Sequence, residues 1–201
     1  MPDRTRPASY ALSQMTHSTA EQGKRERLIA GARELIHRHG VERPTLAEIA
    51  EAAGVPPGNV YYYFKTKDQL IEAVIESRET EVRALLASLD RRRSPAARLK
   101  GLARNWLEVK DLVAAEGCPL GTLAVELNNH GLDCEAARLF SALIDWSEQQ
   151  FRELGCRDPR DQALTLFSTV QGAALLASAF RDPEILASQV RRLNRWIDSL
   201  A

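Results

Sequence analysis

Three of the four tyrosines in the sequence stand in a row, in the stretch GNVYYYFKTK from Gly58 to Lys67. A phenol combines a flat apolar ring with a hydroxyl that both donates and accepts hydrogen bonds. Lys65 and Lys67 place two ammonium groups directly behind them. This combination suits a surface that binds phosphates and sugars, whereas three buried phenols would each need an internal hydrogen-bond partner. We therefore expect the three tyrosine side chains to lie on the surface, where they contact a partner. The alternative is that they pack in the protein core.

A second reactive group is Cys118, in the stretch EGCPLGTLAVEL. Pro119 suits the first position of a helix, which puts Cys118 at the N-cap. There the unpaired backbone N–H groups and the helix dipole favour an anion, and therefore the thiolate. The position predicts a thiol that reacts with a quinone, an aldehyde or an oxidant. An inert buried cysteine is the alternative.

Other chemistry finds less support. An enzyme with Cys118 as nucleophile and His130 as base is conceivable, but the sequence has no glycine-rich phosphate loop, nucleophile elbow or histidine pair at metal spacing. His130 and Cys134 are four residues apart, yet Asp133 between them predicts a turn, and no second ligand pair follows. We therefore expect no enzyme activity, no metal and no cofactor.

Composition and charge describe an ordinary globular protein with a basic N-terminal third. Apolar residues make up 44% and charged residues 27% of the 201 residues. Residues 1–67 hold ten Lys and Arg against seven Asp and Glu, whereas the rest hold seventeen against twenty. The three cysteines lack CxxC spacing, no apolar run approaches the roughly 20 residues of a membrane span, and no secretion signal is recognised. These features predict a cytoplasmic protein whose N-terminal third contacts a polyanion.

The elements that must position these groups are all helical in pattern. Apolar residues recur at three- and four-residue steps, and no stretch alternates with period two. Capping boxes are expected at Thr45 with Glu48 and at Thr66 with Gln69. The pattern predicts an all-α protein of about nine helices. They cover approximately residues 21–39, 45–53 and 57–64, then a long helix from 66 that carries apolar residues as far as 86, and then residues 95–115, 119–129, 134–154, 159–180 and 183–200. Residues 1–20 have no periodicity and are expected to form a flexible arm, in which Arg4 and Arg6 would reach a minor groove or do nothing.

The two short helices determine how the tyrosines point. On a helix, Val60 and Phe64 share one face, so that if this face is buried Tyr62 points nearly opposite. Two helices of about two turns, joined by AGVP, follow a longer helix, and this order is typical of a helix-turn-helix unit. Ala50 is small enough for a close crossing, and Gly54 permits the positive φ of the turn.

The stretch TLAEIAEAAGVPPGNVYYYFKTKDQLIEAV resembles the DNA-binding domain of the tetracycline-repressor (TetR) family, over roughly residues 22–75. The resemblance implies a homodimeric repressor that binds a double-stranded DNA operator and leaves it when the C-terminal helical domain binds a small-molecule inducer. Its implied DNA contacts, to phosphates or to base edges and sugars, are Thr45, Asn59, Tyr61, Tyr62, Tyr63, Lys65 and Lys67. Pro56 and Pro57 stand where the family often has a serine and a basic or polar residue, and Tyr63 replaces a common histidine. A helical adaptor that has lost DNA contact is therefore the alternative.

The remaining predictions concern the rest of the chain. We divide it into the arm (1–20), a DNA-binding domain (21–67) and a ligand-binding and dimerisation domain (68–201). The Gly-Cys-Pro-Leu stretch is similar to a branch of the family in which some relatives sense electrophiles or oxidants at this cysteine. Pocket walls are predicted at Trp106, Cys118, Leu123, Phe140 and Trp146, and solid core is the alternative. The two last helices are apolar on most faces, which predicts dimer contacts at Phe167, Val170, Ala174, Leu175, Val190, Leu193 and Ile197, or else burial in the chain's own core.

Overall fold

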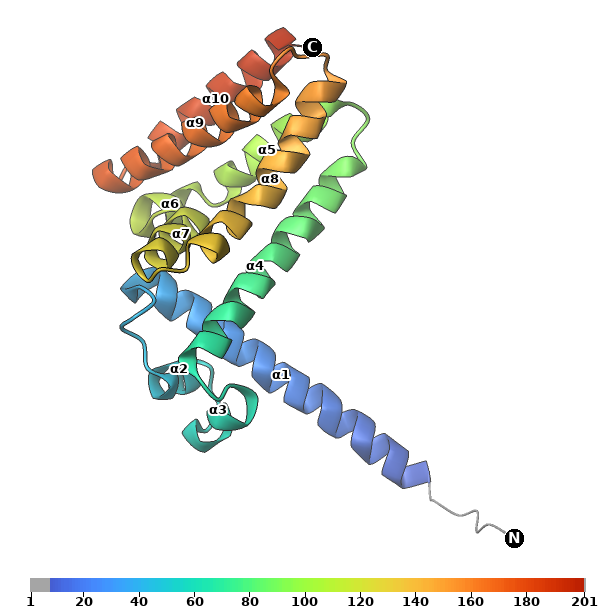
Figure 1. Cartoon of the computed structure of the whole chain (residues 1–201), viewed down its shortest axis with the longest axis vertical. Helices are drawn as coiled ribbons and strands as arrows, with labels where there is room; N and C mark the ends of the chain where they lie inside the picture. Colours follow the sequence, from blue (N-terminus) through green and yellow to red (C-terminus); the bar gives the residue numbers. More distant parts are fainter. Residues whose placement is uncertain (1–7, 201) are drawn as a thin grey trace. The chain divides into compact units, whose positions relative to one another are not determined.

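The computed structural model of the chain describes the backbone of residues 8–200 and, except at Asp133, the side chains of residues 23–200. Every regular element in residues 8–200 is an α-helix, which confirms the predicted all-α class (Figure 1). The helices are α1 (Ala8–His39), α2 (Leu46–Ala52), α3 (Pro57–Tyr63), α4 (Lys67–Asp90), α5 (Pro95–Glu108), α6 (Lys110–Glu116), α7 (Pro119–Asn129), α8 (Asp133–Glu153), α9 (Pro159–Phe180) and α10 (Pro183–Leu200).

Two helix boundaries differ from those predicted. The helix expected over residues 95–115 breaks at Val109, where φ is −114° and ψ is 12°, and this break adds α6. No glycine or proline marks it, so the sequence carries no signal for it. α1 begins at Ala8, so residues 8–20, where no regular element was predicted, are helical. Apolar periodicity reports burial rather than helix, and no proline or glycine interrupts residues 8–20. Arg4 and Arg6 lie outside the described residues.

The chain divides into two compact units, an N-terminal unit up to Val74 and a C-terminal unit from Ile75 onward. The division falls within α4, seven residues beyond the predicted boundary at residue 67. A boundary inside a continuous helix leaves no linker whose composition would announce it. α4 therefore contributes its first two turns to one unit and the rest to the other.

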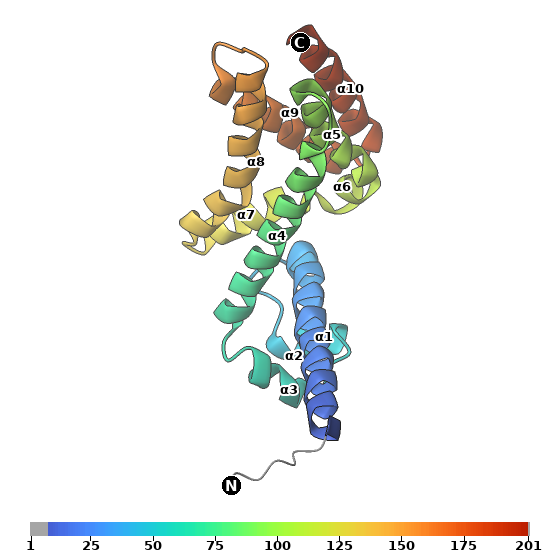
Figure 2. The ribbon, with the colours of Figure 1, turned by 90° about the vertical axis from the view of Figure 1, so that its right-hand side faces the viewer.

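In the N-terminal unit, α2 packs against both α1 and α3 (Figure 2). The core is made of fully or almost fully buried side chains from all four helices and the loops between them, namely Leu28, Ile36, Ile49, Ala50, Val55, Val60, Phe64 and Leu70. Gly31 allows α1 and α2 to approach closely, because a Cβ at Gly31 would lie 3.3 Å from the backbone nitrogen of Ala53 and 3.3 Å from the carbonyl oxygen of Ile49. Gly54 has φ of +60°, as the predicted turn requires.

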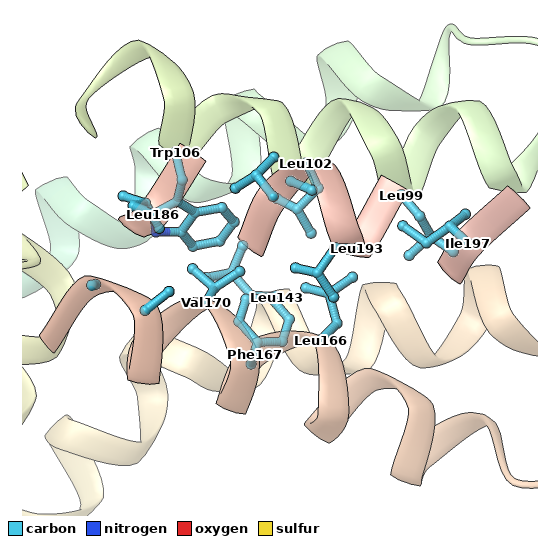
Figure 3. Close-up of a cluster of buried hydrophobic side chains, with 14 of the residues drawn as sticks. Leu99, Leu102, Trp106, Leu143, Leu166, Phe167, Val170, Leu186, Leu193 and Ile197 are labelled. Carbon is cyan, nitrogen blue, oxygen red and sulfur yellow. The ribbon is translucent and has the colours of Figure 1, made fainter. Parts of the chain in front are cut away.

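In the C-terminal unit, α9 packs against α6, α8 and α10, and α10 packs against α5. Figure 3 shows the centre of this core, where side chains of α5, α8, α9 and α10 point toward one another. Trp106 and Phe167 meet edge-on, with ring centroids 5.9 Å apart. Phe151 is fully buried and packs against Trp196.

This packing bears on the predicted dimer contacts. Six of the seven residues are at most 4% exposed within a single chain: Phe167, Val170, Ala174, Val190, Leu193 and Ile197. Figure 3 places four of these, Phe167, Val170, Leu193 and Ile197, in the chain's own core. Side chains this deeply buried within one chain have little surface left for a second chain, so their packing favours the alternative, burial in the chain's own core. Leu175, at 71% exposed, is the one that remains available.

α9 is long and apolar enough to cross a membrane by length and composition alone. The sequence analysis looked for uninterrupted apolar runs and predicted no membrane-spanning segment. α9 was not detected in this way because Thr, Ser and Gln interrupt its apolar residues. One face of α9 is buried in the core of the C-terminal unit, which is the environment expected for an apolar helix of a globular domain. Its other face carries Leu175, Leu176 and Phe180, all exposed.

Candidate nucleic-acid interface and ligand pocket

The short helix α3 holds its tyrosines outside the fold. Val60 is 0% and Phe64 2% exposed, whereas Tyr61 is 58% and Tyr62 66% exposed. Tyr63 is half-buried, and its ring meets that of Tyr62 edge-on at 5.0 Å between centroids. The predicted orientation of the helix is therefore confirmed. The phenols of α3 form an open aromatic surface.

The residues around α3 differ in exposure as the helix geometry requires. Asn59, on the flank of the outward face, is half-buried. Pro56 occupies the N-cap of α3 without any side-chain hydrogen bond, which confirms that the proline removes a cap. Pro57 supplies the first helical position, whose N–H would have no intrahelical partner in any case.

Both lysines behind α3 are bound to the chain's own carbonyl groups. The Nζ of Lys65 donates to the carbonyl oxygen of Tyr61 at 2.6 Å, at the C-terminal end of α3. The Nζ of Lys67 donates to the carbonyl oxygen of Glu42, in the loop between α1 and α2. Lys65 is exposed and Lys67 half-buried. The two ammonium groups therefore stabilise the C-terminal end of α3 and the loop between α1 and α2, and they add positive charge near α3.

The start of α4 departs from the predicted capping box in one detail. The backbone N–H of Gln69 donates to the hydroxyl of Thr66 at 3.2 Å, as expected. The side-chain oxygen of Gln69, however, accepts from the N–H of Lys65 at 2.8 Å. The cap thus includes the residue that follows Phe64, so it joins the end of α3 to the beginning of α4.

Thr45 forms the predicted capping box at the N-terminus of α2. The N–H of Glu48 donates to the Thr45 hydroxyl at 3.2 Å, and a Glu48 carboxylate oxygen accepts from the Thr45 N–H at 2.7 Å. The same oxygen accepts the Thr45 hydroxyl proton at 2.8 Å. These hydrogen bonds, the backbone one first, hold the pKa of Glu48 below its ordinary value. Thr45 is exposed, and its hydroxyl proton is already engaged.

Two residues that support this surface were not predicted. The guanidinium of Arg25 lies over the ring of Phe64, with 5.3 Å from Cζ to the ring centroid. Gly31 sets the distance between α1 and α2. An isolated glycine inside a helical pattern is a sign of close packing, so Gly31 was detectable from the sequence. Arg25 was not, because nothing local links it to Phe64.

Cys118 occupies the predicted N-cap of α7 and is 9% exposed. The side-chain amide of Gln171 on α9 donates to its sulfur at 3.6 Å. Gly121 makes room for this amide, because a Cβ there would lie 2.7 Å from the Gln171 oxygen. Neither Gln171 nor Gly121 was predicted to be near the thiol. Gly121, a glycine in the first turn after Pro119, is the sequence signal that was available.

Cys118 lines two pockets of the C-terminal unit. The larger, which we call the α7–α9 pocket, has a volume of about 560 Å³. Its walls are mostly apolar, and it is lined by Cys118, Gly121, Val125, Phe140, Gln171 and Leu175 among others. The smaller, the α4–α5 pocket, has a volume of about 300 Å³ and contains Arg78, Asn105, Trp106, Cys118 and Leu143. Concave apolar sites with a few polar groups are typical of small-molecule binding.

The predicted pocket walls therefore separate into two groups. Phe140 lines the α7–α9 pocket, Trp106 lines the α4–α5 pocket, and Cys118 lines both. Leu123 is buried and lines neither. Trp146 also lines neither, because its indole N–H donates to the Asp90 carboxylate at 2.8 Å near the end of α4. The two pockets that contain Cys118 therefore include three of the five predicted wall residues and leave out Leu123 and Trp146.

Groups that would support other chemistry are not assembled in the part of the chain that the structure describes. Among these residues no three His, Cys, Asp or Glu side chains lie close enough together to hold a metal ion. Cys134 is exposed and Cys156 half-buried, and both are free thiols. His130 caps the end of α7, outside the two pockets that contain Cys118.

Comparison with known proteins shows which protein family the chain resembles. Residues 28–74 match the model of the bacterial regulatory proteins of the tetR family, and residues 95–191 match the LmrA/YxaF-like C-terminal domain of transcriptional regulators. The transcriptional regulator AcuR of Cereibacter sphaeroides is 30% identical over 214 residues, which cover 96% of this chain and 90% of AcuR. LmrA of Bacillus subtilis, an HTH-type transcriptional regulator, is 30% identical over 166 residues, which cover 76% and 85%.

The chain belongs to the TetR family of transcriptional regulators. A TetR-family regulator from Agrobacterium tumefaciens has the same fold, with a TM-score of 0.76 at 23% identity over 87% of this chain and 97% of that one. Members of the TetR family are DNA-binding regulators of transcription, generally repressors that respond to ligands, and not enzymes. In TetR terms, α2 and α3 are the helix-turn-helix.

Proposed function

We propose that the protein is a cytoplasmic transcriptional repressor that binds a palindromic DNA operator as a homodimer and is released by a small apolar or electrophilic inducer. The observation that carries the DNA-binding part is the orientation of α3. Its phenols point outward while Val60 and Phe64 fix the helix to the protein. In a helix-turn-helix, the second helix enters the major groove, and side chains around it contact phosphates and base edges.

Each polar group near α3 has a role in this proposal. Tyr62, Tyr63 and Asn59 reach base edges or sugars from the outward face of α3. Tyr61 hydrogen-bonds a phosphate from its flank. Lys65 and Lys67, already ordered by backbone carbonyls, add positive charge that attracts the polyanion.

Thr45 can donate to a phosphate only if its hydroxyl first gives up its hydrogen bond to Glu48 in the capping box. Its hydroxyl proton is donated to Glu48, and the phosphate must replace that carboxylate as acceptor. Because like charges repel, the Glu48 carboxylate must then move away from the phosphate or be screened. We therefore propose Thr45 as a weaker contact than Tyr61.

The DNA-binding proposal is tested with a fluorescein-labelled duplex from the region upstream of the protein's own gene. Fluorescence anisotropy should report binding that weakens steeply as salt rises, because phosphate contacts release counterions. Tyr61→Ala should weaken binding about tenfold to a hundredfold, through loss of a hydrogen bond to a charged group. Leu112→Ala, at an exposed apolar position of α6, is the matched control and should leave affinity unchanged. Equal affinity of Tyr61→Ala and wild type would reject the proposed contact surface.

The inducer part of the proposal rests on the two pockets that share Cys118. The α7–α9 pocket is apolar and large enough for a small organic molecule. The α4–α5 pocket is lined in part by α4, the helix that begins at the end of α3 and continues into the C-terminal unit. A ligand that binds one position of α4 better than another shifts the equilibrium between DNA-binding and non-binding states.

Cys118 is the residue with which an electrophilic inducer would react. Its sulfur lies at the N-cap of α7 and accepts a hydrogen bond from the side-chain amide of Gln171. Addition of the thiolate sulfur to the double bond of N-ethylmaleimide forms one C–S bond, and the adjacent carbon takes a proton from water. We expect this adduct to displace Gln171 and release the DNA.

The test compares operator binding before and after N-ethylmaleimide treatment, in a background with Cys134→Ser and Cys156→Ser. Loss of binding with Cys118 present, and its retention in Cys118→Ser, supports the electrophilic inducer. Loss of binding in both proteins shows that the thiol is not the sensor and leaves an apolar, non-covalent inducer.

A further inference from the structure

The two pockets that contain Cys118 differ in the charges that line them. The α7–α9 pocket is lined by two half-buried carboxylates, Glu116 and Glu126, and by no Lys, Arg or His. The α4–α5 pocket is lined by Arg78 and Glu81. Arg78 is therefore the only cationic side chain among the described residues that line either pocket. The inference drawn from this difference rests on the inducer site of the proposed function.

The guanidinium of Arg78 is paired with a carboxylate that another carboxylate can replace. Its Nη1 donates to a Glu81 carboxylate oxygen at 3.2 Å. The side chain of Arg78 is 20% exposed, whereas that of Glu81 is 49% exposed. Ion pairs between exposed residues three positions apart on a helix are weak. The Glu81 side chain can therefore turn toward solvent when a second carboxylate binds Arg78, whose planar fork of N–H donors matches a carboxylate.

The rest of the α4–α5 pocket suits a small apolar molecule. Val82 of α4, Trp106 of α5 and Leu143 of α8 supply apolar walls. The half-buried Asn105 adds an amide that donates hydrogen bonds. The volume of about 300 Å³ is at the lower end of the range for ligand sites, which limits the size of the ligand.

We propose that the inducer is a small apolar carboxylic acid, which binds as its carboxylate in the α4–α5 pocket. Arg78 binds the carboxylate in place of Glu81, and the apolar body packs against Trp106 and Leu143. The α7–α9 pocket does not accept the same molecule, because the two carboxylates that line it repel an anion.

This ligand binds between two side-chain links that join α4 to α8. The Arg138 guanidinium on α8 holds the Glu79 carboxylate on α4 by two hydrogen bonds, of 2.9 and 3.2 Å. Farther along both helices, the Trp146 indole N–H donates to Asp90 at 2.8 Å. Leu143 lies on α8 between Arg138 and Trp146. A carboxylate held by α4 with its body against α8 therefore acts on the spacing of these two helices, and we expect it to shift α4.

Isothermal titration calorimetry with benzoate and hexanoate tests the proposal, and benzamide and hexanamide are the uncharged probes of similar shape. Each acid should bind the wild-type protein at least tenfold more tightly than its amide, because only the acid forms a charged pair with a guanidinium. Arg78→Gln should abolish this preference. Arg83→Gln is the matched control, because it removes the same charge from α4 at a position that is 63% exposed and outside the pocket, and it should keep the preference.

A second variant tests the exchange of carboxylates. Glu81→Gln removes the competing acceptor charge and should bind each acid about twofold to fivefold more tightly than the wild type. If circular dichroism shows that Arg78→Gln loses helicity, this gain and the preference of the wild type for acids decide the matter. Equal binding of acid and amide by the wild type, or no binding of either acid at millimolar concentration, would overturn the proposal. A folded Arg78→Gln that still prefers the acids would overturn it as well.

Operator binding separates this inference from the proposed function. Benzoate or hexanoate should release the labelled duplex from the wild type but not from Arg78→Gln. A protein that binds its operator but shows no preference for acids overturns the carboxylate site and leaves the proposed repressor intact. A protein that binds no operator rejects the proposed function, whereas calorimetry needs no DNA and still decides the site. Acids that bind without releasing DNA would confirm the site and overturn its role as the inducer site.

Discussion

Each unit of the chain displays large side chains, but of two different kinds. On α3 the exposed groups are phenols, with Tyr61 at 58% and Tyr62 at 66%. On α9 they are Leu175 and Phe180, both at 71%, which carry no polar atom. A phenol remains hydrated when its partner leaves, whereas an exposed leucine or phenylalanine gains from permanent cover. The difference suggests a reversible contact at α3 and a lasting one at α9.

The glycines of the two units make the same distinction. Gly31 in α1 faces backbone atoms of its own chain at 3.3 Å, so the N-terminal unit itself accounts for it. Gly172 in α9 faces nothing in its own chain. The sequence alone does not tell a glycine at a close approach from one in open space. The neighbours that a Cβ would meet do, and they show a close approach at Gly31 and open space at Gly172.

The largest effect expected concerns the two faces of α9. Phe167→Ala should lower the free energy of unfolding by about 3–5 kcal/mol, because it leaves a cavity in the core. Leu175→Ala, at a position of the same helix that is 71% exposed, should change the free energy of unfolding of the single chain by less than about 0.5 kcal/mol. Urea unfolding followed by circular dichroism measures both. A large loss for Leu175→Ala would mean that Leu175 stabilises the single chain.

A smaller effect is expected at the glycines of α1. Gly31→Ala forces a methyl group against the backbone of α2 and should lower the free energy of unfolding of the N-terminal unit by about 1–3 kcal/mol. Gly23→Ala has open space and should raise helix stability by about 0.5–1 kcal/mol. Thermal unfolding of the two variants side by side measures the difference. Stabilisation by both substitutions would mean that α1 and α2 can separate without cost.

The helix-turn-helix was predictable because its signals are local. The Thr45–Glu48 box, Gly54 and the spacing of Val60 and Phe64 each depend on residues within one turn of each other, and each was confirmed. The resemblance to the TetR family independently predicted the same helix-turn-helix. The break at Val109 has no such signal, and it was missed.

The C-terminal unit was predicted less well because its contacts are long-range. Apolar character identifies a helix to be covered but not which neighbour covers each face, so dimer contact and burial in the chain's own core stayed alternatives for six core residues of α9 and α10. Gln171 meets Cys118 across 53 residues of sequence, and no periodicity links them. Trp146 was expected at a pocket and instead hydrogen-bonds Asp90. Residue types were enough to place these side chains in the C-terminal unit. Whether each one lies in the core, at a pocket or in a hydrogen bond depends on packing between distant segments.

The smallest effect distinguishes the N-cap of α2 from the DNA contact assigned to Thr45. The pKa of Glu48 is lowered in the folded protein, so its carboxylate contributes stability above its ordinary pKa of 4.5, and this contribution is lost as the pH falls through the lower, folded-state pKa. Glu48→Gln should therefore reduce the midpoint of thermal unfolding near neutral pH, and its difference from wild type should shrink toward zero in acid. Thr45→Ala, which removes the cap, should cost about 1 kcal/mol at neutral pH. Operator affinity at neutral pH supplies the contrast: if Thr45 contacts a phosphate, Thr45→Ala weakens binding while Glu48→Gln, which removes a competing acceptor charge, strengthens it. Equal changes in both variants would assign Thr45 to the cap alone.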